Sequence, residues 1–113
     1  MHELAIAEEI RDIVLKKLRE NKRSRVTAVK LVFGEMTSIV PEALTFAFES
    51  VSEMTPMSGA KIHVKIVKSK GRCCNCGRVF RIIDLNYICP KCSSTDIKII
   101  SGREMTVQTI DME

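Results

Sequence analysis

The chain has 113 residues, of which 45% are apolar, and this length supports one domain with a hydrophobic core and at most a small appendage. With four Phe, one Tyr and no Trp, it has too few aromatic side chains for the stacking surfaces that bind single-stranded nucleic acid. The net charge of +4 is mildly basic, and the basic run KKLRENKRSR at 16–25 is typical of a solvated helix end.

Charged residues interrupt the apolar residues near the start of the chain. Glu3, Glu8 and Arg11 break every apolar run there, so we expect no signal peptide. No stretch of about 20 mostly apolar residues occurs that would span a bilayer. We therefore expect a cytoplasmic protein that makes no contact with a membrane, and in that compartment thiols stay reduced.

The first half of the chain predicts a helix, a strand and a second helix. Apolar residues recur at three- and four-residue steps from Glu3 to about Asn21, which predicts an amphipathic helix. The β-branched segment VTAVKLVFG at 26–34 predicts a half-buried strand. Pro41 marks the start of a second helix, which TPMSG at 55–59 ends. The expected apolar face of that helix consists of Leu44, Ala47, Phe48, Val51 and Met54.

The second half predicts three strands. KIHVKIVKS at 61–69 alternates, with Ile62, Val64 and Ile66 facing one way. IKII at 97–100 and EMTVQTIDM at 104–112 also have strand composition, and Ser101-Gly102 between them is a turn signal.

These elements predict an α+β fold. We expect two helices packed on one face of a three-stranded sheet formed by 26–33, 60–69 and 104–112. This α/β domain comprises 1–69 plus 101–113, and residues 70–100 protrude from it as an inserted zinc-ribbon-like module.

Five cysteines crowd into the segment CCNCGRVFRIIDLNYICPKC. Cys73 and Cys76 form one C-x-x-C pair, Cys89 and Cys92 form another, and twelve residues that include the strand-like VFRII separate the pairs. Four thiolates satisfy tetrahedral zinc, and a module this small needs a metal in order to fold. A redox dithiol, an iron–sulfur site and unrelated buried thiols are the alternatives to structural zinc. Cys74 is a spare thiol open to oxidation.

A closed site of four cysteines offers no open position for catalysis, so the function lies elsewhere. The chain begins Met1-His2-Glu3. The α-amino nitrogen of Met1, the amide nitrogen of His2 and its imidazole can chelate one metal nearly in a plane, which favours nickel or copper. Glu3 or another donor would complete the set. The alternative is that His2 is an ordinary surface residue ahead of a helix.

Four stretches together resemble one known family. MHELAIAEEI, VFGEMTSIVPEALTFAFE at 32–49, the two C-x-x-C pairs and STDIKIISGREM at 94–105 are similar to the hydrogenase nickel-incorporation (maturation) family HypA/HybF. The resemblance implies His2 as the principal nickel ligand with Met1 and Glu3 contributing, and it implies structural zinc on the four paired cysteines.

The resemblance also implies a function. Members of that family are nickel metallochaperones without enzymatic activity, which work with the GTPase HypB to load the [NiFe]-hydrogenase large subunit, and some also serve urease. We also expect a monomer or homodimer that binds no nucleic acid.

Two other functions stay open from the residues alone. A zinc-ribbon protein that binds nucleic acid fits the basic charge, although the arm at 77–88 carries few cations. A hydrolase that uses the terminal metal lacks a recognisable nucleophile and base. Glu35 and Glu42 flank a loop that could approach the N-terminus and add a nickel ligand, whereas His63 on its strand is expected to be no ligand.

Overall fold

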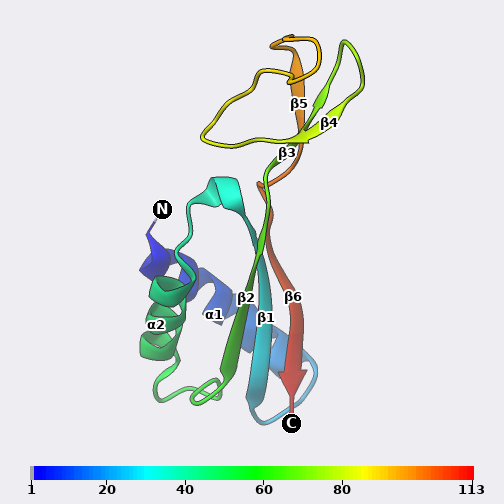
Figure 1. Ribbon diagram of the computed structural model, residues 1–113. Helices are drawn as coiled ribbons and strands as arrows, with labels where there is room; N and C mark the ends of the chain where they lie inside the picture. Colours follow the sequence, from blue (N-terminus) through cyan, green and yellow to red (C-terminus); the bar gives the residue numbers. More distant parts are fainter. Residues whose placement is uncertain (1) are drawn as a thin grey trace.

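The computed structural model describes residues 2–113 and shows an elongated molecule with two lobes (Figure 1). Its principal extents are 55 × 25 × 17 Å and its radius of gyration is 17.6 Å, compared with about 13 Å for a compact domain of this length. The larger α/β lobe contains both helices, and the smaller lobe, here called the cysteine module, contains all five cysteines.

Helix α1 (Glu3–Glu20) ends at Asn21, whose N–H and side-chain amide both donate to the carbonyl of Lys17. These bonds satisfy a carbonyl that the helix itself leaves unpaired. The buried stripe lies at the predicted spacing and consists of Ile6, Ala7, Ile10, Val14 and Leu18. Two further apolar residues of the helix, Leu4 and Ile13, have the same periodic spacing but are about half exposed.

The α/β lobe has a three-stranded sheet in the order β2-β1-β6. Strand β1 (Val26–Gly34) is central, runs parallel to β2 (Lys61–Val67) and antiparallel to β6 (Met105–Met112). Helix α2 (Pro41–Ser52) supplies the crossover that two parallel strands require. Both helices cover one face of the sheet (Figure 1).

The main core lies between this sheet face and the helices. Its largest buried side chains are Phe33, Phe48, Leu31, Leu44 and Met57. From β2 only Ile62 and Val64 pack against it. Ile66, predicted on the same face, is 37% exposed, because it lies near the end of an edge strand that has a neighbouring strand on one side only.

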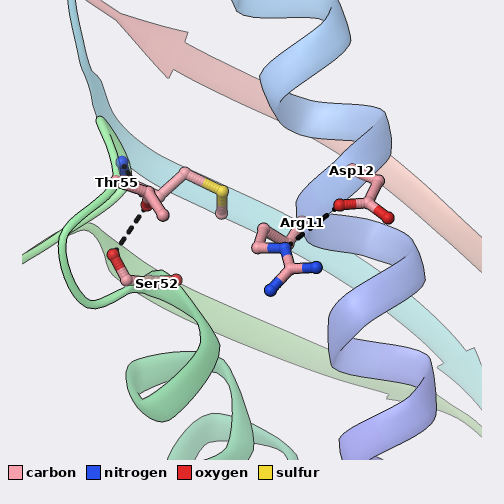
Figure 2. A network of polar contacts seen from close by, with 5 residues as sticks. Arg11, Asp12, Ser52 and Thr55 are labelled. Carbon is pink, nitrogen blue, oxygen red and sulfur yellow. Dashed lines mark hydrogen bonds and ion pairs between the residues drawn. The ribbon is translucent and has the colours of Figure 1, made fainter.

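The turn after α2 sends the chain back into the core. The Thr55 hydroxyl donates to the carbonyl of Ser52 and accepts from the N–H of Met57, and Met57 is buried. Figure 2 shows this turn facing Arg11 of α1, which pairs with Asp12. The expectation for Met54 was wrong: it lies past the helix with φ 61° and is fully exposed, because the helix stops first.

The cysteine module has its own small sheet in the order β4-β3-β5, with both pairs antiparallel. The strands are β3 (Lys70–Cys73), β4 (Val79–Arg81) and β5 (Ile97–Ser101). Strand β4 falls in the predicted VFRII arm. The predicted strand at 61–69 ends instead at Val67, because the N–H of buried Ser69 bonds to a side chain rather than to a neighbouring strand.

The architecture confirms the predicted α+β fold, with two helices over a three-stranded sheet and an inserted cysteine-rich module. A short 3-10 helix, η1 (Glu35–Thr37), follows β1 and was not predicted. Within residues 2–113, neither helix combines the length and the apolar character that crossing a bilayer demands.

Candidate metal centre

Four thiols meet at one point of the cysteine module. The Sγ atoms of Cys73, Cys76, Cys89 and Cys92 all lie within 4.8 Å of one another. The separation is 3.5 Å between Cys73 and Cys92 and 3.6 Å between Cys76 and Cys89. Four sulfurs about 2.3 Å from a zinc ion at tetrahedral angles would be about 3.8 Å apart. The donor set therefore fits a tetrahedral metal ion of the zinc type.

The two C-x-x-C turns share one hydrogen-bond pattern. The carbonyl of Cys73 accepts from the N–H of Gly77, and the carbonyl of Cys89 accepts from the N–H of Ser93, both at 2.9 Å. The residue after the second cysteine is left-handed in each turn, with φ 80° at Gly77 and 63° at Ser93. Each turn thus presents its two sulfurs in the same way to a shared centre.

Hydrogen bonds within the cluster tune its thiols. The pKa of Cys73 is lowered chiefly by the N–H of Cys76, and that of Cys92 chiefly by the side-chain amide of Asn75. Burial raises the pKa of Cys89, but hydrogen bonds from the N–H groups of Cys92 and Lys91 and from neighbouring thiols together outweigh burial, and the net shift is downward. At Cys76 a backbone N–H lowers the pKa, yet burial and the neighbouring thiols together raise it to about 11. Four thiolates this close repel one another, so full ionisation requires a bound cation.

Each C-x-x-C turn is here called a knuckle. The first knuckle contributes Cys73 and Cys76 to the cluster, as the spacing predicts. Cys74 is exposed and stands outside the cluster. Its backbone N–H donates to the carbonyl of Asp96, which ties the first knuckle to the segment before β5. Cys73 and Cys89 are each only 1% exposed, so half of the cluster is shielded from solvent.

The N-terminal candidates lie apart from this cluster. Among residues 2–113 the four cysteines are the only group of three or more His, Cys, Asp and Glu side chains gathered closely enough to hold a metal. Met1 lies outside the described residues. His2 is exposed and extended, and its carbonyl accepts from the N–H of Ile6 as the first bond of α1.

Helix α1 begins at the end of the α/β lobe that faces the cysteine module (Figure 1). Ile6, one turn into α1, lines a hollow together with Phe33 near the end of β1 and Met105 at the start of β6. That is the end of the sheet from which the chain passes to the module and back. His2 therefore lies on the module side of the lobe.

The other candidate metal ligands, His63, Glu42 and Glu35, lie on three different elements. His63 is exposed on β2, and Glu42 is exposed on the first turn of α2. Glu35 was considered as a further nickel ligand, but both of its oxygens are occupied: Oε1 accepts from the N–H of Ser69 at 3.1 Å and Oε2 pairs with Arg81 at 2.9 Å. The Ser69 bond is the largest cause of the lowered pKa of this carboxyl.

Sequence reasoning missed two features of this region. It did not assign Ser93 a left-handed conformation, although Ser93 has the same place after its knuckle as Gly77. It also missed the contact between Glu35 and Arg81, which are 46 residues apart; no local pattern reports such a pair.

Comparison with known proteins places the chain in one family. A family model described as hydrogenase/urease nickel incorporation, metallochaperone, hypA, matches residues 1–112. The hydrogenase maturation factor HypA of Chlorobaculum parvum is 35% identical over 113 residues and the alignment covers both chains completely. The HypA of Caldanaerobacter subterraneus is 32% identical over 114 residues, again with complete coverage of both.

Two solved structures share the fold. A solution structure of the nickel metallochaperone HypA from Helicobacter pylori aligns with a TM-score of 0.69 at 24% identity, covering 99% of this chain and 97% of that one. A second solution structure of a HypA protein aligns with a TM-score of 0.74 at 24% identity, over 100% and 97% of the two chains.

The structural matches establish the fold, and the sequence matches establish the relationship. The family model spans nearly the whole chain, and relatives above 30% identity align with it from end to end. The chain therefore belongs to the HypA family of hydrogenase and urease nickel-incorporation proteins.

Proposed function

We propose that this chain is a nickel metallochaperone, which binds Ni²⁺ at its N-terminus and delivers it for maturation of [NiFe]-hydrogenase. The observation that carries the proposal is the family match over residues 1–112. The exposed position of His2 directly ahead of α1 supports it, since a metal in transit needs a site that a partner can reach.

The proposed nickel ligands are the Met1 amino group, the amide nitrogen and imidazole of His2, and a donor from Glu3. Amide ligation requires the N–H proton to leave. The first intrahelical bond runs from the N–H of Ile6 to the carbonyl of His2, so the N–H of His2 takes no part in the helix. Nickel can replace that proton without breaking a helical hydrogen bond. Three nitrogens in adjacent chelate rings favour the square-planar geometry of Ni²⁺.

Delivery explains why no catalytic arrangement is needed. The chain would act without turnover, by releasing nickel to a protein that offers a better ligand set. The GTPase HypB and the [NiFe]-hydrogenase large subunit are the proposed partners, and urease is a further proposed recipient because the family model includes nickel incorporation into urease.

The cysteine cluster has the supporting structural role in this proposal. Cys73, Cys76, Cys89 and Cys92 would hold Zn²⁺, as their sulfur separations support. Zinc would supply the folding energy of a zinc-binding domain at 70–100, which has little core of its own. Residues 1–69 with 101–113 would form the nickel-binding domain.

The test is a nickel titration of the zinc-loaded protein by calorimetry and absorbance. We expect one nickel ion with a square-planar absorbance band in the wild type and loss of both in His2→Ala. His63→Ala is the matched control, since it removes an exposed histidine from β2 and should bind nickel like the wild type.

A variant with one extra residue ahead of Met1 tests the role of the amino group. The extension keeps His2 and Glu3 but moves the free amine away, so we expect it to lose the square-planar band. If the extended variant and His2→Ala both bind nickel like the wild type, the N-terminal assignment is wrong. A salt-sensitive gel shift with nucleic acid would then be the next assay.

A further inference from the structure

One carboxylate, that of Glu35, contacts both sides of the junction between the two lobes. Glu35 lies in η1, directly after the central strand of the α/β lobe. Its Oε1 accepts from the N–H of Ser69, in the segment between β2 and β3, and its Oε2 pairs with Arg81 of β4 at 2.9 Å. One side chain of the α/β lobe is thus bonded to the connecting segment and to the cysteine module.

Ser69 is the fixed centre of this junction. It is only 3% exposed, and its carbonyl accepts from the N–H of Ile82, which follows β4. Ser69 therefore donates to the α/β lobe and accepts from the module. A buried backbone group that already has its partner resists displacement, because losing that partner leaves it unsatisfied.

The second connecting segment is held close to the first. The carbonyl of Gly102 accepts from the N–H of Met36 at 2.8 Å. A Cβ atom on Gly34 would lie 1.9 Å from the carbonyl carbon of Gly102, and a Cβ on Gly102 would lie 2.5 Å from the hydroxyl oxygen of Ser69. Gly102 therefore lies in close contact with the end of β1 and with Ser69, and neither Gly34 nor Gly102 has room for a side chain.

Beyond this crossing the lobes diverge. A cleft of about 450 Å³ opens between them, lined on one side by Glu35 and Met36 and on the other by Arg81, Ile83 and Leu85. Figure 1 shows the module reached only through the two narrow connecting segments. A few contacts at the junction, rather than a broad packed interface, must therefore set the angle between the lobes.

We propose that Glu35 and Arg81 form a latch that fixes the orientation of the cysteine module above the end of the α/β lobe that carries His2. Both are positioning residues in this proposal and neither binds a metal. The latch goes beyond the proposed function, because it concerns the relative orientation of the lobes whatever metal either one holds.

The chemistry of the pair suits a latch. A guanidinium and a carboxylate can form and break a charge-assisted bond at little net cost when both are partly exposed, and here the two side chains are 44% and 39% exposed. The N–H of Ser69 keeps the Glu35 carboxylate aimed at the cleft while Arg81 leaves it. While the pair is formed the orientation of the module is held, and once Arg81 has left, the module can swing about the glycine crossing without unfolding either lobe.

The test measures residual dipolar couplings of the zinc-loaded, nickel-free protein in a dilute alignment medium. Couplings from the two lobes share one alignment tensor if their orientation is fixed, and give two different tensors if they move independently. We expect one common tensor for the wild type and two for Arg81→Gln and for Glu35→Gln. Gln at position 35 keeps an oxygen for the N–H of Ser69 but loses the charge that holds Arg81.

Two further variants make the result specific. Glu20→Gln removes an exposed ion pair with Lys17 within α1 and should keep the single tensor. Arg81→Lys keeps a positive charge opposite Glu35 and leaves the bond from the N–H of Ser69 in place, so it should also keep a common tensor.

Couplings within each lobe report on folding separately, so a variant that misfolds is distinguished from one that only loses orientation. A single tensor retained in both Arg81→Gln and Glu35→Gln would overturn the latch, and so would two tensors in the wild type. None of these measurements involves nickel, so they stand apart from the test of the proposed function.

Discussion

The two knuckles predict opposite effects for substitutions at equivalent positions. Gly77 and Ser93 each follow the second cysteine of a knuckle, donate the same hydrogen bond and have φ values of 80° and 63°. The left-handed region destabilises a residue with a Cβ by about 1–2 kcal/mol. Ser93 is subject to this destabilisation and Gly77 is not. We therefore expect Ser93→Gly to stabilise the metal-bound module and Gly77→Ala to destabilise it.

The conformational entropy of the unfolded chain reduces this free-energy difference. Glycine loses more backbone entropy on folding than a residue with a Cβ does, which offsets about 0.4–1 kcal/mol. The net effect is about 0.5–1 kcal/mol in each direction. A Cβ at position 77 meets no atom within 4 Å, so no clash adds to this figure. If zinc supplies the folding energy of the module, as proposed above, the change will be seen as about a two- to fivefold change in zinc affinity.

The assay is competition for zinc between the protein and a chromogenic chelator at fixed pH. Ser93→Gly should bind zinc more tightly than the wild type and Gly77→Ala more weakly. Gly59→Ala is the matched control: Gly59 lies in the α/β lobe with φ 77° and no atom within 4 Å of a built Cβ. It should lower the melting temperature of that lobe without changing zinc affinity. Equal affinities in both knuckle variants, or shifts of the same sign, would refute the reasoning.

Further predictions concern the core, the latch and the cluster. Leu44→Ala empties a fully buried site and should cost about 2–5 kcal/mol in urea unfolding, whereas Phe46→Ala, at a side chain 73% exposed, should change stability by less than about 0.5 kcal/mol. The pKa of Glu35 is lowered, so the stability from its contacts is present above about pH 4.3, the ordinary glutamate value, and is lost as the pH falls through the lowered value. The dipolar couplings should therefore be identical at pH 6 and pH 8. A difference between the couplings at these two pH values would contradict this prediction. Cys74→Ser should leave zinc stoichiometry at one in a chelator assay and Cys73→Ser should abolish tight binding, while a loss in both would place Cys74 in the cluster. Removing the metal with a strong chelator should broaden the amide signals of 70–101 and preserve those of the α/β lobe.

The sequence alone determined the elements and the cysteine register. Apolar periodicity of 3.6 and alternation of 2 are local properties, and they placed both helices and the three strands of the main sheet within a few residues of their observed bounds. The spacing of Cys73, Cys76, Cys89 and Cys92 singled out the four thiols that cluster. It did so because a two-residue loop lets both of its thiolates reach one ion.

Predictions from local patterns were inaccurate near the ends of β2 and α2. The strand at 61–69 was predicted two residues too long, since Ser69 gives its N–H to Glu35 rather than to a strand. Met54 matched the helical period but lies outside the helix, because its place depends on where the Ser52–Thr55 turn sends the chain. Ile66 lies in the strand that its alternation predicts, but it is near the end of the edge strand β2 and is 37% exposed.

The tertiary structure alone decided how the lobes meet. Glu35 resembled any surface acid in the sequence, and only the fold brings it 2.9 Å from Arg81 and beside Ser69. Orientation between lobes depends on a few contacts between residues that are 34 and 46 positions apart. Such contacts leave no periodic signature, because each is a single pairing between segments whose approach is set by the packing of everything between them. The sequence specified which four thiols gather in one cluster, and the fold specified how the two lobes are held in relation to each other.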